Sequence, residues 1–331
     1  MAPRLLSIAI VGGSGFIGSA LAENLRDQFR VTIVDVKPSM ISDVRFTRCD
    51  IRDKEAVDRQ LREFDLIINT AVVQVPEVNE RKRFGYEVNV LGVQNLCELT
   101  ESSDSIRGLI HASSWHVFGE RDFRGNLDEM YGFRPDKVDE RARFYALCKI
   151  AQEVVIRLTS EMSSKDCSIL RLGTVLGTGM PRQTAANIFI ESALRNEPIR
   201  PFKHSMHRPM LYVDLRDVCV GFRSLVTRIA DRQATKEETA PRTVNVIFPH
   251  AITVIELAQL VQRKVTKLTC GRIKPKIEIV DTGEKVTYSP KDKKTLRVSA
   301  FRARRFLGID RFTPPEESVE QIIAARLQRA V

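Results

Sequence analysis

Two side chains that could exchange a proton with a substrate, Tyr145 and Lys149, stand one helical turn apart in a segment with helical spacing. A tyrosine hydroxyl titrates near pH ~10 and is a poor base at neutral pH, but a neighbouring ammonium favours the phenolate and lowers its pKa. The pair is therefore suited to removing a proton from an alcohol. Taken alone, such a spacing is more often an ordinary Tyr/Lys pair on a helix surface.

Two serines favour the catalytic interpretation. Ser113 and Ser114 follow the apolar run Gly108–His111, which has the composition of a strand covered on both faces. Ligands of open α/β sheets bind at the carboxyl ends of the strands. A serine hydroxyl at that edge could hydrogen-bond the substrate oxygen beside Tyr145.

A glycine-rich turn, VGGSGFIG over Val11–Gly18, follows one apolar run and opens a helical segment. Glycine permits the tight turn and the close approach of backbone to a pyrophosphate, and the helix amino terminus offers free N–H groups to the phosphates. Asp35 ends the next apolar run, where a carboxylate accepts hydrogen bonds from the adenosine ribose and repels a 2′-phosphate. The pattern predicts NAD as the cofactor, although Lys37 leaves NADP open.

The first half alternates short apolar runs with longer amphipathic segments. The predicted strands are Ser7–Val11, Arg30–Asp35, Arg45–Cys49, Leu66–Asn69, Gly108–His111 and Cys167–Leu172, and the predicted helices are Phe16–Gln28, Lys54–Glu63, Tyr86–Glu101 and Phe144–Glu161. This alternation is typical of an α/β fold with a doubly wound parallel sheet of the Rossmann type. We expect residues 1–172 to form an NAD-binding domain.

The second half is less regular and richer in glycine and proline near its start. The predicted helices are Ala186–Arg195, Leu215–Thr227, Val254–Lys267, Ser299–Leu307 and Glu316–Gln328, and the predicted strands are Thr243–Ile247, Ile277–Val280 and Thr295–Val298. We expect residues 173–331 to form a smaller C-terminal substrate-binding lobe, interleaved with the first domain in the fold.

Composition narrows the class of protein. The 331 residues are 43% hydrophobic and 28% charged, which is ordinary for a soluble globular protein and excludes a fibre or a disordered chain. No apolar run is long enough for a membrane span.

Residues 1–165 carry a net charge of −2 and residues 166–331 a net charge of +12. The basic half indicates an anionic partner, which could be a nucleic acid, a membrane surface or a phosphorylated small molecule.

The six cysteines are scattered without CxxC spacing, and no histidine stands at metal-ligand spacing beside them. They are typical of reduced packing residues in a cytoplasmic protein, and we expect no metal site.

Together these features resemble the extended short-chain dehydrogenases/reductases, and among them the NAD-dependent epimerase/dehydratase family, over nearly the whole chain. Asn89–Gly92 resembles the family's NVxGT helix, and Ser113–Gly119 resembles its SSxxVYG segment. Arg171–Gly177 resembles LRxxNVYG, and Arg208–Asp214 resembles the segment whose arginine contacts a substrate phosphate.

The resemblance implies a set of site residues. The catalytic residues would be Ser114, Tyr145 and Lys149. The cofactor would contact Gly12, Gly15, Phe16, Ile17, Gly18, Asp35, Asp50, Ile51, Ala71, Asn89, Tyr145, Lys149 and Val175. The substrate would contact Ser114, Trp115, His116, Thr174 and Arg208.

The chain departs from the family at informative positions. The family's dehydratases carry an Asp-Glu pair directly after the catalytic hydroxyl residue, whereas Trp115 and His116 stand there in this chain, which disfavours 4,6-dehydration. For His116, pocket lining and ordinary packing remain equally open. Thr174 replaces an asparagine that commonly touches the sugar diphosphate.

The resemblance implies an NAD-dependent epimerase that oxidises a hydroxyl of a nucleotide sugar transiently and returns the hydride to the other face. One alternative is an NAD-dependent sugar or alcohol dehydrogenase/reductase of the same family. Another, of a different class, is a non-catalytic NAD-binding or RNA-associated protein. The family also implies a homodimer formed through Tyr86–Glu101 and Phe144–Glu161. Arg208 offers a cation for a diphosphate, so a small anion is favoured over a nucleic acid as the partner of the basic half.

Overall fold

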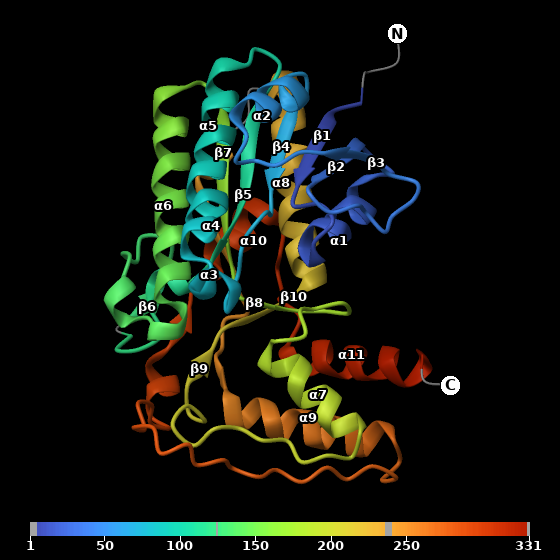
Figure 1. Ribbon diagram of the computed structural model, residues 1–331, viewed down its shortest axis with the longest axis vertical. Helices are drawn as coiled ribbons and strands as arrows, with labels where there is room; N and C mark the ends of the chain where they lie inside the picture. Colours follow the sequence, from blue (N-terminus) through green and yellow to red (C-terminus); the bar gives the residue numbers. More distant parts are fainter. Residues whose placement is uncertain (1–4, 124, 236–239, 330–331) are drawn as a thin grey trace.

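The computed structural model describes residues 5–123, 125–235 and 240–329, and within them seven strands form one parallel sheet (Figure 1). The strand order is β11-β7-β5-β4-β1-β2-β3. The bounds are β1 Ser7–Val11, β2 Arg30–Asp35, β3 Arg45–Arg48, β4 Leu66–Asn69, β5 Gly108–Ser114, β7 Asp166–Leu172 and β11 Thr243–Val246. The predicted doubly wound Rossmann fold is confirmed, and the second half of the chain contributes its edge strand β11.

Helices cover both faces of the sheet because the side chains of each strand alternate between them. In β1, Ile8 and Ile10 pack toward one core cluster, and Ala9 and Val11 pack toward another. The helices of the sheet layer are α1 Phe16–Leu25, α2 Lys54–Leu61, α5 Gly92–Ser102, α6 Glu140–Met162, α8 Leu215–Thr235 and α10 Phe301–Leu307. Helix α5 packs on both α2 and α6, and helix α8 packs on both α1 and α10.

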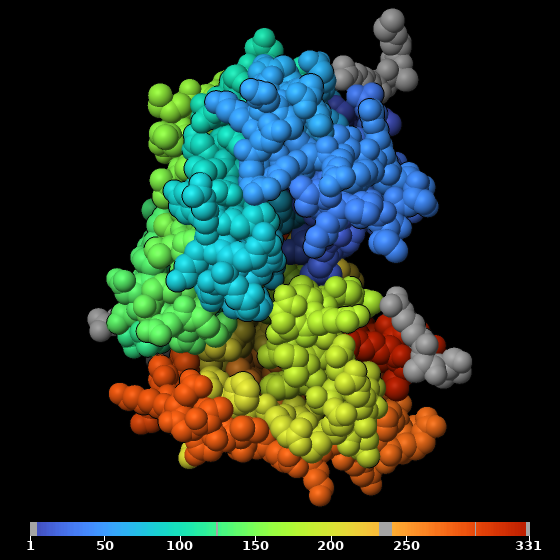
Figure 2. Space-filling model, viewed as in Figure 1, coloured from blue at the N-terminus to red at the C-terminus, as the bar shows by residue number. Residues whose placement is uncertain are grey.

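The remaining helices, α7 Ala185–Leu194, α9 Val254–Leu268 and α11 Pro315–Arg329, gather at the carboxyl end of the sheet (Figure 1). Short strand pairs connect them to the sheet layer. These pairs are β8 Thr174–Leu176 with β10 Tyr212–Asp214, β9 Pro209–Met210 with β12 Ile252–Thr253, and β6 Asn126–Leu127 with β13 Arg297–Val298. Figure 2 shows the surface hollowed where the blue and cyan part of the sheet layer meets the yellow-green segment that holds α7.

Two predictions of local structure are wrong. The segment Ile277–Val280 is not a strand, because only single bridges join Ile277 to Ile199 and Val280 to Phe202. The segment Thr295–Val298 is divided between the 3-10 turn η4 Asp292–Thr295 and the short strand β13. Both segments lie in a loop-rich region whose partners are distant in sequence, so an apolar run there does not find a full strand to pair with.

The predicted helical segment Tyr86–Glu101 is helical throughout, but its first part is not a regular α-helix. The chain forms α3 Glu77–Glu80 and α4 Lys82–Tyr86, then a π-helical turn, η1 Glu87–Leu91, and then α5. π-Helical turns inside α-helices frequently occur at functional sites. No helix in the described ranges is long and apolar enough to cross a membrane.

Candidate active site

The glycine turn between β1 and α1 has the shape that a pyrophosphate requires. Gly12 has a φ of +75°, and a Cβ there would lie 2.5 Å from the backbone nitrogen of Ala71. A Cβ on Gly18 would lie 2.3 Å from the carbonyl oxygen of Gly12, so helix α1 packs directly on the turn. Gly15 is exposed and provides no side-chain cap. The N–H groups at the start of the helix, from Phe16 onward, are therefore available to a phosphate.

Asp35 ends β2 beside this turn and is held by two backbone N–H groups. One carboxylate oxygen accepts a hydrogen bond from the Ser14 nitrogen at 3.1 Å, and the other accepts one from the Lys37 nitrogen at 3.0 Å. Each carboxylate oxygen can accept further hydrogen bonds. The turn and this carboxylate together fit a dinucleotide whose ribose carries free hydroxyls, as NAD does.

Phe16, Ile17 and Val175 lie where α1 meets the chain after β7. A Cβ on Gly177 would lie 3.2 Å from the ring of Phe16, so this loop passes directly over the helix start. Val175 pairs with Val213 in the β8–β10 ladder, and it packs with Ile17 against the same core cluster. The predicted contact of these three residues with NAD stays a prediction.

Three other predicted cofactor residues have partners within the protein. The Arg52 guanidinium binds the Asp50 carboxylate with a shortest N–O distance of 2.6 Å, and this hydrogen bond lowers the pKa of Asp50. Ile51 is buried against the start of α5. The Asn89 amide is buried and bonds the Val73 nitrogen at 2.8 Å and the Val73 oxygen at 2.9 Å. Asn89 therefore fixes the loop after β4, and the predicted contact of Asp50, Ile51 and Asn89 with NAD stays a prediction.

The structure brings the three predicted catalytic residues together. Ser114 is the last residue of β5, and Tyr145 and Lys149 lie on α6, which packs against β5 and β7. The Ser114 hydroxyl lies close enough to the Tyr145 hydroxyl to lower the Tyr145 pKa. The Lys149 Nζ atom lies 5.9 Å from the centre of the Tyr145 ring and donates a hydrogen bond to the Ala112 oxygen at 2.7 Å.

The predicted lowering of the Tyr145 pKa by Lys149 is wrong. Burial raises the pKa of Tyr145 to about 12, and the nearby Ser114 hydroxyl opposes this only in part. Burial also lowers the pKa of Lys149 to about 7, and its Nζ is bonded to a backbone carbonyl. The sequence spacing was sufficient to put the two residues on one face, but it carried no information on the burial that dominates both pKa values.

Trp115 and His116 continue directly from β5 as the start of the 3-10 turn η2 Trp115–Phe118. The buried Trp115 ring donates a hydrogen bond from Nε1 to the Thr174 Oγ1 atom at 3.2 Å. His116 Nδ1 lies 3.0 Å from Ser114 Oγ. Its ring also meets the Tyr145 ring edge-on, with the centroids 5.7 Å apart. His116 therefore contacts both catalytic hydroxyl residues, which the sequence had left undecided.

Arg208 lies beside this group, but it is paired with a carboxylate of the protein. Its Nη1 atom donates to one Asp139 oxygen at 3.1 Å, and the Tyr288 hydroxyl donates to the other. The Arg208 side chain is 13% exposed, and its Nε atom is buried without a hydrogen-bond partner. Burial raises the pKa of Asp139, but Tyr288 and Arg208 outweigh this effect and the pKa is lowered. A phosphate at Arg208 would compete with Asp139.

A fully buried carboxylate, Glu120, completes the group. It accepts hydrogen bonds from Arg141 Nη2 at 2.9 Å and from the Asp139 nitrogen at 2.8 Å, and its Oε1 atom lies 3.7 Å from His116 Nε2. None of Glu120, Asp139, Arg141 and Tyr288 was expected from the sequence. The spacing of four residues between His116 and Glu120 is a signal that could have identified Glu120. Tyr288 lies in a loop distant in sequence, and no motif around it indicates that it reaches this site.

A buried ion pair fixes α6 to the sheet. Arg171 of β7 and Glu153 of α6 approach to 2.8 Å with side-chain exposures of 1% and 0%. The Ser113 hydroxyl donates to the same carboxylate at 2.7 Å. Because Glu153 lies one turn beyond Lys149 and Ser113 immediately precedes the catalytic serine, this pair sets the distance between the two halves of the catalytic group.

The class of protein follows from two features of the fold. A glycine turn follows the first strand of the parallel sheet, and Ser114, Tyr145 and Lys149 come together from β5 and α6. This combination defines a dinucleotide-dependent enzyme of the short-chain dehydrogenase/reductase type. The family model "NAD dependent epimerase/dehydratase family" matches residues 8–246, and the chain belongs to this family. Membership confirms NAD as the predicted cofactor.

Known proteins with the same architecture share low sequence identity with this chain. A protein of Methanocaldococcus jannaschii named as a candidate UDP-glucose 4-epimerase is 28% identical over 218 residues, covering 62% of this chain and 69% of that protein. D-erythronate dehydrogenase of Haemophilus influenzae is 28% identical over 205 residues, covering 59% and 62%. The structure of Thermus thermophilus UDP-glucose 4-epimerase complexed with NAD superposes with a TM-score of 0.75 at 22% identity, covering 98% of this chain and 100% of that one.

Proposed function

We propose that the protein is an NAD-dependent epimerase of a nucleotide sugar, acting by transient oxidation of a sugar hydroxyl. The observation that carries the proposal is the contact between Ser114 and Tyr145 at the carboxyl edge of the sheet that also bears the glycine turn. The chemistry that NAD supplies when bound is the reversible acceptance of a hydride. Gly12, Gly15 and Gly18 would hold its pyrophosphate and Asp35 its ribose.

The protein's own residues would handle the substrate oxygen and its proton. Tyr145 is partly exposed at the site, so its hydroxyl can meet a substrate hydroxyl. Ser114 would orient that oxygen by a hydrogen bond. Lys149 would hold the nicotinamide ribose once its Nζ atom leaves the Ala112 carbonyl. The Trp115–Thr174 pair would form a rigid wall of the sugar pocket, because each side chain fixes the other.

A nucleotide diphosphate is the substrate anion that the site suits best. The buried Nε atom of Arg208 lacks a partner, and a guanidinium binds phosphate oxygens through two parallel hydrogen bonds. UDP-glucose 4-epimerase from T. thermophilus and the candidate from M. jannaschii support the same substrate class by similarity. We further propose that residues 1–172 bind the cofactor and that residues 173–331 bind the substrate.

A specific similarity supports a second candidate function. D-erythronate dehydrogenase matches this chain with the same identity as the epimerase-like relative, although its name indicates a net oxidation of a small acid. A dehydrogenase would release its reduced cofactor after each turnover. A non-catalytic NAD-binding or RNA-associated protein is disfavoured by the assembled Ser114, Tyr145 and Lys149 group.

The experiment is incubation of the purified protein with a panel of UDP- and dTDP-linked hexoses and with D-erythronate, read by mass spectrometry coupled to chromatography and by NADH absorbance. A stereoisomeric nucleotide sugar without NADH supports the epimerase. Stoichiometric NADH supports the dehydrogenase and refutes the epimerase. A Tyr145→Phe variant is the control for contaminating activity.

We also propose a homodimer built on the outer faces of α4–α5 and α6. Several large apolar side chains there are at least 45% exposed, and they follow one face of α6 and the neighbouring turn: Tyr86, Leu91, Leu147, Val154, Leu158 and Met162. Exposed apolar patches of this kind mark protein–protein contacts. A second copy of the chain would bury them.

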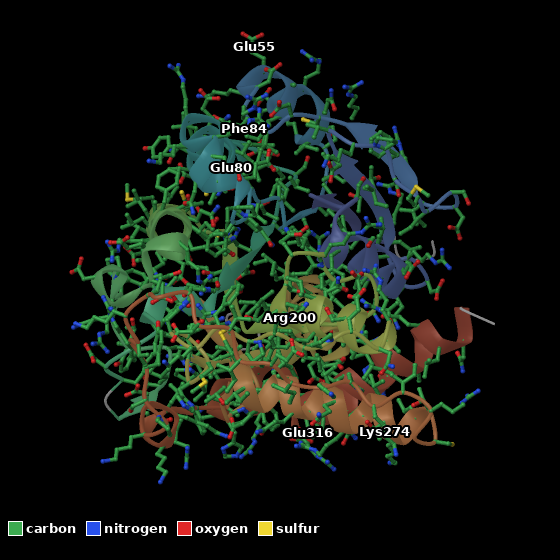
Figure 3. The ribbon with its side chains drawn as sticks, turned by 60° about the horizontal axis from the view of Figure 1, so that its bottom comes forward. Glu55, Glu80, Phe84, Arg200, Lys274 and Glu316 are labelled. Atoms are coloured by element: carbon green, nitrogen blue, oxygen red, sulfur yellow. The ribbon has the colours of Figure 1, made fainter. Side chains whose placement is uncertain are left out.

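Several basic side chains of the lobe are paired with carboxylates of the protein, among them Lys203 with Asp281 and Lys293 with Glu256. Arg200 and Lys274 lie there, far from Glu80 and Phe84 of the sheet layer (Figure 3), and Arg200 is paired with Glu278 at 3.3 Å. This pairing favours a solvated surface over a nucleic-acid site.

All six cysteines, which lie in the described part of the chain, are free thiols. Free thiols are in keeping with a reducing compartment, and we propose a cytoplasmic location.

A further inference from the structure

We propose that Asp139 is a resident counter-ion of Arg208 which the diphosphate of the substrate displaces, and that Tyr288 holds the displaced carboxylate. The inference deepens the proposed function and rests on it, because it takes Arg208 as the residue that meets the diphosphate. Asp139 is then a positioning residue that determines which anions the site admits. Neither Asp139 nor Tyr288 belongs to a motif by which the chain resembles its family.

The Asp139 side chain does not cap the helix that it begins. Asp139 is the N-cap of α6, but its side chain accepts no hydrogen bond from the first N–H groups of that helix. An aspartate at an N-cap normally accepts such a bond and stabilises the helix. Here one carboxylate oxygen accepts a hydrogen bond from the Tyr288 hydroxyl, and the other accepts one from Arg208 Nη1 at 3.1 Å. The side chain therefore serves Arg208 instead of the helix.

Tyr288 reaches Asp139 at the end of a strap, residues 276–288, which is fixed along residues 199–204. Backbone hydrogen bonds join the two segments near both ends, from the Ile199 nitrogen to the Lys276 oxygen at 2.8 Å and from the Thr287 nitrogen to the His204 oxygen at 3.3 Å. The Tyr288 side chain itself is buried. Its hydroxyl is therefore held beside Asp139 independently of Arg208.

The charges of this group cancel before any ligand binds. Arg141 pairs with Glu120 at 2.9 Å, and Arg208 pairs with Asp139 at 3.1 Å. The Arg141 Nε atom also lies 3.8 Å from the Asp139 oxygen that Arg208 contacts. A ligand with a single carboxylate would only replace one carboxylate at Arg208 by another. A diphosphate carries more charge and more acceptor oxygens, so the exchange favours this class of anion.

Arg208 has an atom that the exchange would satisfy. Its Nε atom is buried without a hydrogen-bond partner, although Nη1 is bonded to Asp139. A buried donor that lacks a partner costs free energy, and a phosphate oxygen at Nε would recover it. A guanidinium also binds phosphate through two parallel hydrogen bonds, which a diphosphate can form once Asp139 has withdrawn.

The exchange lies at a suitable distance from the catalytic hydroxyl groups. Asp139 precedes Tyr145 by six residues, so the two lie about 9 Å apart along the axis of α6. The Asp139 nitrogen donates to Glu120 at 2.8 Å, and Glu120 lies 3.7 Å from His116, which follows Ser114 closely in the chain. This separation resembles the length of a hexose with its phosphate link. A sugar held at Tyr145 can therefore place its diphosphate at Arg208.

The first test measures the affinity of the NAD-saturated protein for UDP and for inorganic pyrophosphate by isothermal titration calorimetry. Asp139→Asn keeps the shape but removes the competing charge, so both ligands should bind roughly 10-fold more tightly. Tyr288→Phe leaves the displaced carboxylate without its partner, so both should bind roughly 5-fold more weakly. Asp281→Asn is the matched control, because it removes a carboxylate of the same strap that pairs with Lys203 at 2.8 Å, and it should bind both ligands as the wild type does.

The double variant separates the exchange from a structural role of the strap. Once Asp139→Asn has removed the charge, Tyr288→Phe should have no further effect on either Kd. A tyrosine that only supports the fold would weaken binding in both backgrounds. Unchanged or weaker binding by Asp139→Asn overturns the proposal, and so does an effect of Tyr288→Phe that persists beside Asp139→Asn.

A crystal structure of the wild-type protein with NAD and UDP tests the exchange without any substitution. Arg208 should bond the diphosphate, and the Asp139 carboxylate should keep Tyr288 and lose Arg208. An intact pair of Arg208 and Asp139 beside bound UDP overturns the proposal. Failure of both UDP and pyrophosphate to bind the wild type and Asp139→Asn overturns it as well.

The sugar panel decides the proposed function separately. If the affinities change as predicted but no panel sugar is converted, the epimerase is refuted and the exchange stands. If a sugar is converted but Asp139→Asn binds UDP with the wild-type affinity, the exchange is refuted and the epimerase stands.

Discussion

Glu153→Gln is the substitution that tests most sharply how the catalytic group is held. It removes the charge of Glu153 with almost no change in shape and leaves Arg171, 1% exposed, without its counter-charge. Breaking a buried ion pair in this way costs about 3–5 kcal/mol. For a chain of 331 residues we expect the unfolding midpoint to fall by roughly 4–7 °C.

Arg157→Gln is the matched control, because Arg157 contacts the same carboxylate at 3.0 Å but is 35% exposed. The expected cost is below about 1 kcal/mol, since solvent screens an exposed partner. Urea denaturation followed by circular dichroism gives the free energies of unfolding of both variants and the wild type. An equal decrease in the free energy of unfolding of the two variants would refute the reasoning that the buried pair holds α6 against β7. A decrease below about 1 kcal/mol for Glu153→Gln would refute it as well.

Three further predictions concern the cofactor turn, the buried lysine and the apolar face. Gly18→Ala should weaken NADH binding roughly 10-fold or more in a fluorescence titration, because its Cβ would lie 2.3 Å from the Gly12 oxygen; Gly132→Ala, with nothing within 4 Å, should bind normally. Burial lowers the pKa of Lys149 to about 7, below its value in the unfolded chain, so the unfolded state binds more protons above pH 7. The wild-type free energy of unfolding should therefore rise relative to Lys149→Met as the pH increases from about 7 toward 10, and a pH-independent difference between them would contradict the burial. Leu158→Arg should give a monomer by light scattering, whereas Met130→Arg, at a residue that is more exposed but lies off the apolar face, should leave a dimer; a wild-type monomer would exclude the proposed interface.

Much of the sheet layer could be predicted because its signals are local. The apolar runs Ser7–Val11, Arg30–Asp35 and Leu66–Asn69 are strands in the structure, since a strand covered on both faces has a continuous apolar sequence. The glycine turn and Asp35 were predictable for a related reason, because a few adjacent residues determine the conformation of a turn and the end of a strand. Their positions in the structure follow from the parallel order of β1 and β2.

The parts that were missed depend on contacts between distant residues. The π-turn Glu87–Leu91 contains Asn89, whose amide bonds the backbone of Val73 sixteen residues earlier. The pKa of Tyr145 follows from burial, which its spacing from Lys149 does not reveal. The bond from Tyr288 to Asp139 joins residues 149 positions apart. No local pattern could have indicated these contacts.

The central claim is that a carbon-bound hydrogen of the sugar leaves as hydride and returns to the same carbon. The most direct measurement is conversion of UDP-glucose, or whichever panel sugar reacts, with deuterium on every ring carbon in ordinary water. Mass spectrometry of the stereoisomeric product should find all deuterium retained, because the hydride stays on the bound cofactor and does not exchange with solvent. Loss of one deuterium to water in step with product formation would contradict the account.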